Sequence, residues 1–230
     1  MAYNDQELND STYELAIKYD KRTFCEYYCS LIKTKNIFIF SFIYSGDYNS
    51  KIIKIDLFFI GFIMFFTVNA LFFNDDTMHK IHEDKGKYEI LFQLPQIVYS
   101  SLISTVLDIL LKILALSESD ILELQSKKTK KNLNKKEEDL NNKLRIKFLL
   151  FFILGTILLL LFWYYISMFC AIYQNTQLHL IKDTLLSFSL SLIYPFGIYL
   201  LPGLFRIPAL SDEKKKRKYL YLFSKILQMF

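Results

Sequence analysis

Long apolar runs separated by polar stretches dominate the hydropathy pattern of this 230-residue chain. Each run reaches the roughly 20 residues that an α-helix needs to cross about 30 Å of hydrocarbon. The pattern therefore predicts an all-α membrane protein with four transmembrane helices. Their expected bounds are residues 53–73, 91–116, 148–173 and 185–205.

Basic residues gather in every second gap between these runs. Residues 1–54, 117–147 and 206–230 hold 7, 9 and 7 Lys and Arg, whereas residues 74–90 and 174–184 hold 3 and 1. Because cytosolic loops carry an excess of Lys and Arg, this asymmetry predicts that both termini and the middle loop are cytosolic. The pattern does not distinguish a plasma membrane from an endomembrane.

The sequence divides into three expected segments. These are a cytosolic N-terminal segment (residues 1–52), a four-helix transmembrane bundle (53–205, with the cytosolic loop 117–147) and a basic amphipathic cytosolic tail (206–230). The basic clusters attract anionic inner-leaflet lipids, so the lipid bilayer is an expected partner; alternatively, they only fix the topology. Because the charge is juxtamembrane, we expect no nucleic-acid partner.

Two further segments are expected at the membrane surface. Ile37–Tyr44 is strongly apolar but too short to span, which indicates a re-entrant or interfacial piece, or one packed under the bundle. In the tail, Ser224, Lys225 and Gln228 share one face of a helix whose remainder is apolar. That pattern is typical of an interfacial amphipathic helix.

Polar side chains inside the first two predicted spans are the candidate intramembrane positions. The Asn69 amide is expected to bond across helices. A polar stripe on the second span is expected to face other helices rather than lipid. The stripe consists of Tyr99, Ser100, Ser101, Ser104 and Thr105.

Asp108 and Lys112 follow on the second span at the i, i+4 spacing that places them on one helix face. At 1.5 Å per residue, Asp108 lies about 26 Å beyond Leu91, close to the inner interface. This depth favours a paired, snorkelling anchor over a proton relay.

Prolines mark the expected helix breaks. Pro95 stands near the start of the second span, where proline is better tolerated than at a deeper site. Pro195 and Pro202, together with Gly197 and Gly203, predict a broken or kinked fourth span. Such a break lines a cavity in a channel or transporter, or is absorbed by neighbouring helices; the sequence leaves both open.

No catalytic signature appears, so we expect a non-enzyme without catalytic, cofactor-binding or metal sites. The three cysteines, Cys25, Cys29 and Cys170, form neither a disulfide framework nor a zinc pattern. His79 and His82 stand among carboxylates in the predicted outer loop, and both ligand types suit zinc. No third histidine or cysteine joins them, which favours a solvated loop. All three histidines are expected in outer loops.

Short motifs resemble the transmembrane block of the large adhesion-type polycystins. Val68–Phe73 (VNALFF) is similar to an "N-A-M-F-Y" helix ending in that family, and Phe169–Tyr173, Gln177, Leu185–Phe188 and Pro195 resemble its next helical pair. The resemblance covers about residues 57–205. The resemblance includes no counterpart of that family's lipid-binding PLAT domain, of its ectodomain or of its channel helices. Similar transmembrane blocks are found at the end of protist surface proteins.

The resemblance implies a non-catalytic, polycystin-like accessory or anchoring bundle. Its expected partner is another membrane protein, such as a cation channel subunit. The alternative is an oligomeric small channel or transporter, supported by the broken fourth span and by Asp108 and Lys112. Because four helices enclose little volume, this alternative requires oligomers.

Overall fold

The computed structural model describes most of the chain as α-helix. It leaves out residues 1–2, 74, 84–86, 88–89, 119, 123–132, 174–175, 212–216 and 230, and it describes only the backbone of residues 133–135 and 229. The described residues contain no strand. They form two compact units. The central unit is residues 52–191, and the terminal unit combines residues 1–51 with residues 192–230.

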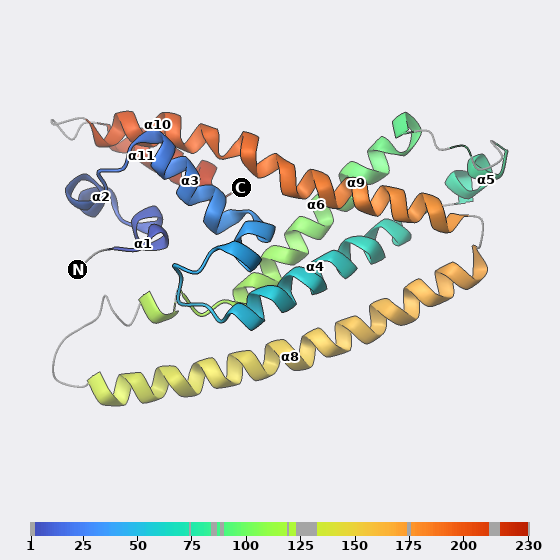
Figure 1. The fold of residues 1–230 in the computed structure, drawn as a ribbon, viewed down its shortest axis with the longest axis horizontal. Helices are drawn as coiled ribbons and strands as arrows, with labels where there is room; N and C mark the ends of the chain where they lie inside the picture. Colours follow the sequence, from blue (N-terminus) through green and yellow to red (C-terminus); the bar gives the residue numbers. More distant parts are fainter. Residues whose placement is uncertain are drawn as a thin grey trace. The chain divides into compact units, whose positions relative to one another are not determined.

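Four stretches of helix are long and apolar enough to cross a membrane, which confirms the predicted number of spans. They are α4 (Lys51–Leu71), α6 (Ile90–Ala115), α8 (Leu133–Ile172) and α9 (Gln177–Ile198) with α10 (Leu200–Leu210). At 40 residues, α8 is longer than its predicted span because it begins in the Lys-rich segment (Figure 1).

Aromatic and small side chains pack α4 within the central unit. Phe58, Phe62 and Phe65 recur on one face of α4, and their rings meet Phe188 of α9 at centroid distances of 5.6, 5.1 and 5.4 Å. All three pairs are edge-to-face, the arrangement that aromatic quadrupoles favour. On α8, Gly155 lies against Ile60, where a Cβ would approach the Ile60 side chain to 3.0 Å. Gly155 therefore permits a close approach of α8 to α4.

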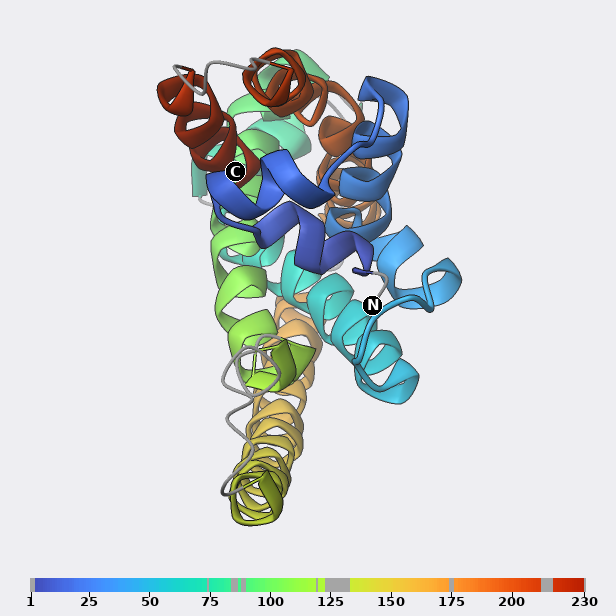
Figure 2. The same cartoon turned by 90° about the vertical axis from the view of Figure 1, so that its left-hand side faces the viewer.

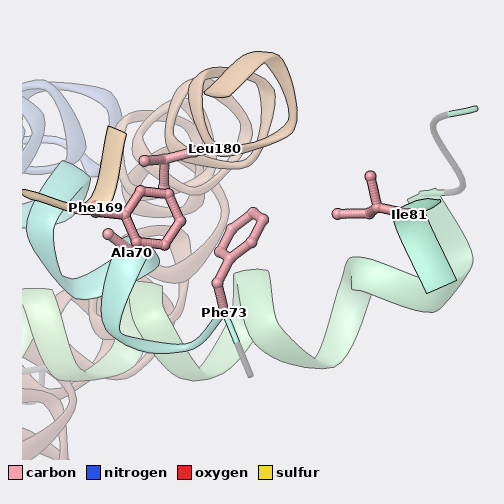
Figure 3. Packing of buried hydrophobic residues seen from close by; sticks show 5 residues of the cluster. All are labelled: Ala70, Phe73, Ile81, Phe169 and Leu180. Carbon is pink, nitrogen blue, oxygen red and sulfur yellow. The ribbon is translucent and has the colours of Figure 1, made fainter. Parts of the chain in front are cut away.

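A second apolar cluster closes one end of the central unit (Figure 3). Its buried members are Ala70, Phe73, Ile81, Phe169 and Leu180. They come from the end of α4 and the segment after it, from α5 (Asp75–Glu83), from α8 and from α9. The rings of Phe73 and Phe169 meet edge-to-face at 5.6 Å. The cluster thus ties the segment between the first two spans to the helix ends around it.

Residues far apart in the sequence assemble the terminal unit. Its N-terminal elements are α1 (Asp5–Asp10), α2 (Tyr13–Tyr19), α3 (Phe24–Lys35) and the π-helix η1 (Ile39–Ile43). These helices pack with α10 and with α11 (Lys218–Met229), as Figure 2 shows for the blue and red ends of the chain. Capping boxes fix two of the helix starts, Asn4 with Glu7 and Thr23 with Glu26. The N-terminal segment is therefore largely helical from Asp5 to Ile43.

The predictions for the positions of the histidines were wrong. The expected outer loop contains the helix α5, with His79 and His82 on it, and His179 is a buried residue of α9 rather than a loop residue. In α11 the polar side chains Ser224 and Gln228 are buried against the protein, and Phe223 and Ile226 are exposed. The polar face of α11 therefore packs inward, because its groups find hydrogen-bond partners in the terminal unit. The exposed apolar face is the one that an interfacial helix would turn to the membrane, and the interfacial position of α11 stays a prediction.

The fourth span breaks between its two prolines, as predicted. Helix α9 runs through Pro195 and ends at Ile198, and α10 starts again at Leu200. A proline ring clashes with the carbonyl four residues earlier, which for Pro202 is that of Ile198. Pro202 itself lies in the first turn of α10, where its missing N–H costs nothing. Pro95, in contrast, lies inside the continuous helix α6.

Candidate functional site: a polar seam between three membrane helices

Buried polar side chains of the central unit form a line between α4, α6 and α9. We call this line the polar seam. Its members are Asn69, Gln93, Ser100, Ser104, Asp108, Asp183 and Ser187. The four α6 members from Gln93 to Asp108 extend over about 22 Å of helix at 1.5 Å per residue. They recur at spacings of seven, four and four residues, which keeps them on one face of α6.

The Asn69 amide is the centre of the seam and joins all three helices. Its Nδ2 donates to the Ser187 hydroxyl at 2.7 Å and to the Phe65 carbonyl at 2.9 Å. Its Oδ1 accepts a hydrogen bond from the Ser100 hydroxyl at 2.8 Å. Asn69 is fully buried. The predicted bonding of this amide across helices is therefore confirmed, and it involves two neighbours at once.

A buried carboxylate, Asp183, lies one turn along α9 from Ser187. The Gln96 amide donates to its Oδ2 at 3.3 Å. The Gln93 amide, turned with its nitrogen toward the carboxylate, donates to both of its oxygens. Both glutamines belong to α6, so hydrogen bonds connect α6 to α9 at this end of the seam as well. Hydrogen bonds of this kind are what allow an ionisable group to be buried in a membrane protein.

The other end of the seam is less completely hydrogen-bonded. Asp108 Oδ2 pairs with Lys112 Nζ at 2.7 Å, which confirms the predicted ion pair. Its Oδ1 and the Ser104 hydroxyl have no hydrogen-bond partner in the described part of the chain. A Cβ on Gly61 would lie 3.5 Å from that Oδ1, so glycine brings α4 close to Asp108. Since Gly61 meets Asp108 and Asn69 meets Ser100, α4 and α6 run antiparallel.

Only Ser100 and Ser104 of the predicted polar stripe on α6 belong to the polar seam. Ser100 and Ser104 are fully buried, but Tyr99 is 59% exposed and Ser101 and Thr105 are half-buried. The Thr105 hydroxyl donates to the Ser101 carbonyl of its own helix. Side chains three and four residues apart share a helix face, whereas adjacent ones do not. Ser101 therefore lies beside the seam, not in it.

A buried arginine, which the sequence interpretation counted only as tail charge, organises the terminal unit. Arg206 is 0% exposed and donates from Nε and Nη2 to Asp20 Oδ2 at 3.1 and 2.8 Å. Its Nη groups also donate to the carbonyls of Leu8 and Asn9. The rings of Tyr27 and Tyr221 stack on the guanidinium, each centroid 4.8 Å from Cζ. Arg206 thus joins the N-terminal helices to α10 and α11.

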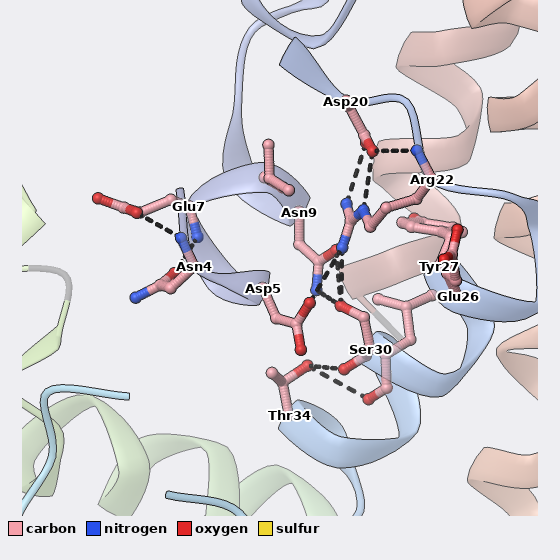
Figure 4. Close-up of polar contacts among 12 residues, drawn as sticks. Asn4, Asp5, Glu7, Asn9, Asp20, Arg22, Glu26, Tyr27, Ser30 and Thr34 are labelled. Carbon is pink, nitrogen blue, oxygen red and sulfur yellow. Dashed lines mark hydrogen bonds and ion pairs between the residues drawn. The ribbon is translucent and has the colours of Figure 1, made fainter. Parts of the chain in front are cut away.

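Asp20 also binds a second arginine, Arg22, through bonds of 2.8 and 3.0 Å (Figure 4). Burial alone would raise the pKa of Asp20, but the hydrogen bonds and positive charge of Arg22 and Arg206 outweigh it and hold that pKa below its ordinary value. Burial raises the pKa of Tyr27 to about 12, so its phenol stays neutral and donates to Gln228 at 3.2 Å.

Acidification is expected to weaken the terminal unit. Because the folded pKa of Asp20 lies below its ordinary 3.8, its stabilisation is complete above about pH 5. The stabilisation is lost as pH falls through the folded pKa. Thermal melts in detergent between pH 6 and pH 3 should show a fall in melting temperature that Asp20→Asn diminishes. Equal pH dependence of the two proteins would contradict this account.

A control separates this effect from that of Asp120 in the central unit. Burial would raise the pKa of Asp120, but Lys143 and Lys147 lie 2.7 and 2.8 Å from its oxygens and hold that pKa below its ordinary value. Asp120→Asn should therefore remove a different part of the acid-sensitive stability. The changes caused by the two substitutions should add, because the residues belong to different units.

The seam contains hydroxyls and carboxylates but no assembled reactive group. The hydroxyls of Ser100 and Ser187 donate only to an amide and to carbonyl oxygens, so neither is activated by a base. The described residues include no group of three His, Cys, Asp or Glu side chains that suits a metal ion. His79 instead contacts Glu83 at 3.1 Å on the exposed face of α5. The hydrogen bonds of the seam join α4, α6 and α9 to one another.

Sequence reasoning missed Gln93, Asp183, Ser187 and Arg206. Two of them carried a usable signal. Asp183 precedes the predicted fourth span by two residues, and extending that helix toward Gln177 places it inside the bundle. Arg206 stands in the apolar stretch Leu200–Leu210, where a charge needs a buried partner. The partners themselves were not predictable, because Asp20 is distant in sequence.

Comparison of the chain with protein-family models, with curated proteins and with solved structures finds no match. The resemblance to the polycystin transmembrane block therefore stays a prediction.

Proposed function

We propose that this protein is a non-catalytic four-span bundle that associates with another membrane protein along α8. The observation that carries the proposal is the exposure of this helix. Only 11% of the most apolar 18-residue stretch of this helix is buried within the protein, against 56% for the corresponding stretch of α4. A helix of a four-helix bundle ordinarily packs against two neighbours.

The exposed side chains of α8 support a protein contact in addition to lipid. Leu160, Trp163 and Tyr164 are 65%, 73% and 68% exposed. Tryptophan and tyrosine contribute large contact areas at low entropic cost and are enriched in interfaces. The resemblance to polycystins suggests a cation channel subunit as the partner. On this proposal the protein is an accessory or anchoring bundle.

The proposed orientation places both termini in the cytosol. The alternating distribution of Lys and Arg supports it. The packing of α2 with α11 also supports it, since segments before the first and after the last span then share one side, as an even number of spans requires. The basic clusters would contact anionic lipids at about 1 kcal/mol per residue near the surface.

Site-specific photo-crosslinking in native membranes tests the association. A photo-reactive residue at Leu160 should give an adduct of one defined protein mass. The matched control is Val106 of α6, which is 58% exposed and lies in another apolar span. It should give lipid adducts only. Lipid adducts alone at both positions would refute the proposal.

The second candidate function is an oligomeric channel or transporter. The observation that favours it is the incompletely hydrogen-bonded end of the seam at Ser104 and Asp108. Unpaired polar groups in a membrane interior are typical of ion and solute pathways. Reconstituted vesicles should then conduct ions or small solutes, and Asp108→Asn should lower the flux. Absence of flux from wild-type vesicles would eliminate this alternative.

A further inference from the structure

A groove between α4 and α8 of the central unit combines apolar walls with one carboxylate. Its volume is about 510 Å³. From α4 it is lined by Asp56, Phe59 and Ile60, and from α8 by Phe152, Thr156 and Leu159, among others. The polar seam lies elsewhere, between α4, α6 and α9.

Asp56 distinguishes this groove from an ordinary lipid-facing surface. Its carboxylate is partly buried and has no hydrogen bond or ion pair with the described residues. The carboxylates of Asp108 on α6 and Asp183 on α9, in contrast, both bind donors. An ionised group in an apolar setting is unfavourable unless a cation pairs with it. A positively charged group from outside the described chain would therefore stabilise the ionised Asp56 carboxylate.

The size of the groove limits what that partner is. A transmembrane helix is about 10 Å wide and about 30 Å long, so it occupies on the order of 2,000 Å³. The groove is several times smaller and falls within the range of small-molecule sites, about 300–1,000 Å³. Its apolar walls suit one alkyl chain.

We propose that the groove binds a single-chain lipid with a primary ammonium head, chemically a long-chain amine. The ammonium would donate to the Asp56 carboxylate, and the alkyl chain would lie between Phe59 of α4 and Leu159 of α8. Asp56 follows the start of α4 by five residues, about 8 Å at 1.5 Å per residue. A charged head at this depth remains near the membrane surface while its chain extends inward.

Charge and size both select this ligand over the ordinary bilayer lipids. A quaternary ammonium has no N–H to donate, whereas a primary ammonium has three donors, like that of lysine. A two-chain phospholipid carries its ammonium beyond a phosphate, farther from its acyl chains. This binding proposal does not rest on the proposed association along α8.

Binding of sphingosine to the purified protein tests the proposal, with neutral N-acetylsphingosine as the matched ligand. Native mass spectrometry should detect one sphingosine per chain. Asp56→Asn keeps the shape of the side chain and should weaken sphingosine binding about tenfold, the low end for a charge-assisted hydrogen bond. Binding of N-acetylsphingosine should be weak and the same in both proteins.

Two substitutions on α8 test the location. Thr156→Phe should abolish sphingosine binding because it fills the groove from an exposed position. Ile157→Phe, which introduces the same ring one residue farther on and outside the groove, should bind as wild type does. Wild-type affinity of the Asp56→Asn protein, equal binding of the two lipids, or a groove filled by a second copy or another protein would each overturn the proposal.

Discussion

Replacing Asp20 with alanine should lower the stability of the terminal unit by about 3–5 kcal/mol. The substitution leaves Arg206 buried, at 0% exposure, without its only carboxylate among the described residues. Removing one partner of a buried ion pair costs about this much because the remaining charge stays desolvated. Arg22 loses the same partner.

Unfolding in detergent, followed by circular dichroism, measures the effect. Glu14→Ala is the matched control, since Glu14 is an exposed carboxylate of α2. Its stability should stay within about 0.5 kcal/mol of wild type. A loss below about 1 kcal/mol for Asp20→Ala would show that Arg206 is not held by this carboxylate.

Replacing Asn69 with alanine should destabilise the central unit by about 1–3 kcal/mol. The substitution removes the amide that joins α4 to Ser100 of α6 and to Ser187 of α9. Leaving buried polar groups without a partner costs this amount, and a small cavity adds to it. The two serines keep bonds to carbonyls of their own helices, which limits the loss.

A double-mutant cycle with Ser187→Ala isolates the interhelical bond. Interhelical hydrogen bonds in membrane proteins average about 0.6 kcal/mol and reach about 1.7. We expect a coupling in the upper half of that range, because Asn69 and Ser187 are both 0% exposed. Ser101→Ala should change stability by less than about 0.5 kcal/mol, since Ser101 lies beside the seam. Zero coupling would contradict the seam.

The helices were predictable because hydropathy and length decide them. The starts and ends of α4 and α6 fall within two residues of the predicted spans. The i, i+4 spacing of Asp108 and Lys112 predicted their ion pair, because both residues are on one helix. Interactions within one helix follow from sequence spacing alone.

Interactions between helices were harder to predict. Asn69 indicated a bond across helices, but Ser187 is 118 residues away and nothing in the sequence pairs the two. Likewise, Arg206 and Asp20 are 186 residues apart. The partner of Gln228 on α11 was not predictable for the same reason, since Tyr27 is 201 residues away.

The central claim is that four helices cross the bilayer. Its most direct test is to measure on which side of the membrane two exposed carboxylate positions lie. In a protein whose three cysteines are replaced by serine, a single cysteine is placed at Asp76 of α5 or at Asp139 of α8. In sealed membrane vesicles, an impermeant maleimide should label only one of the two positions before permeabilisation, and both after it. Labelling of both positions from the same side would contradict the account.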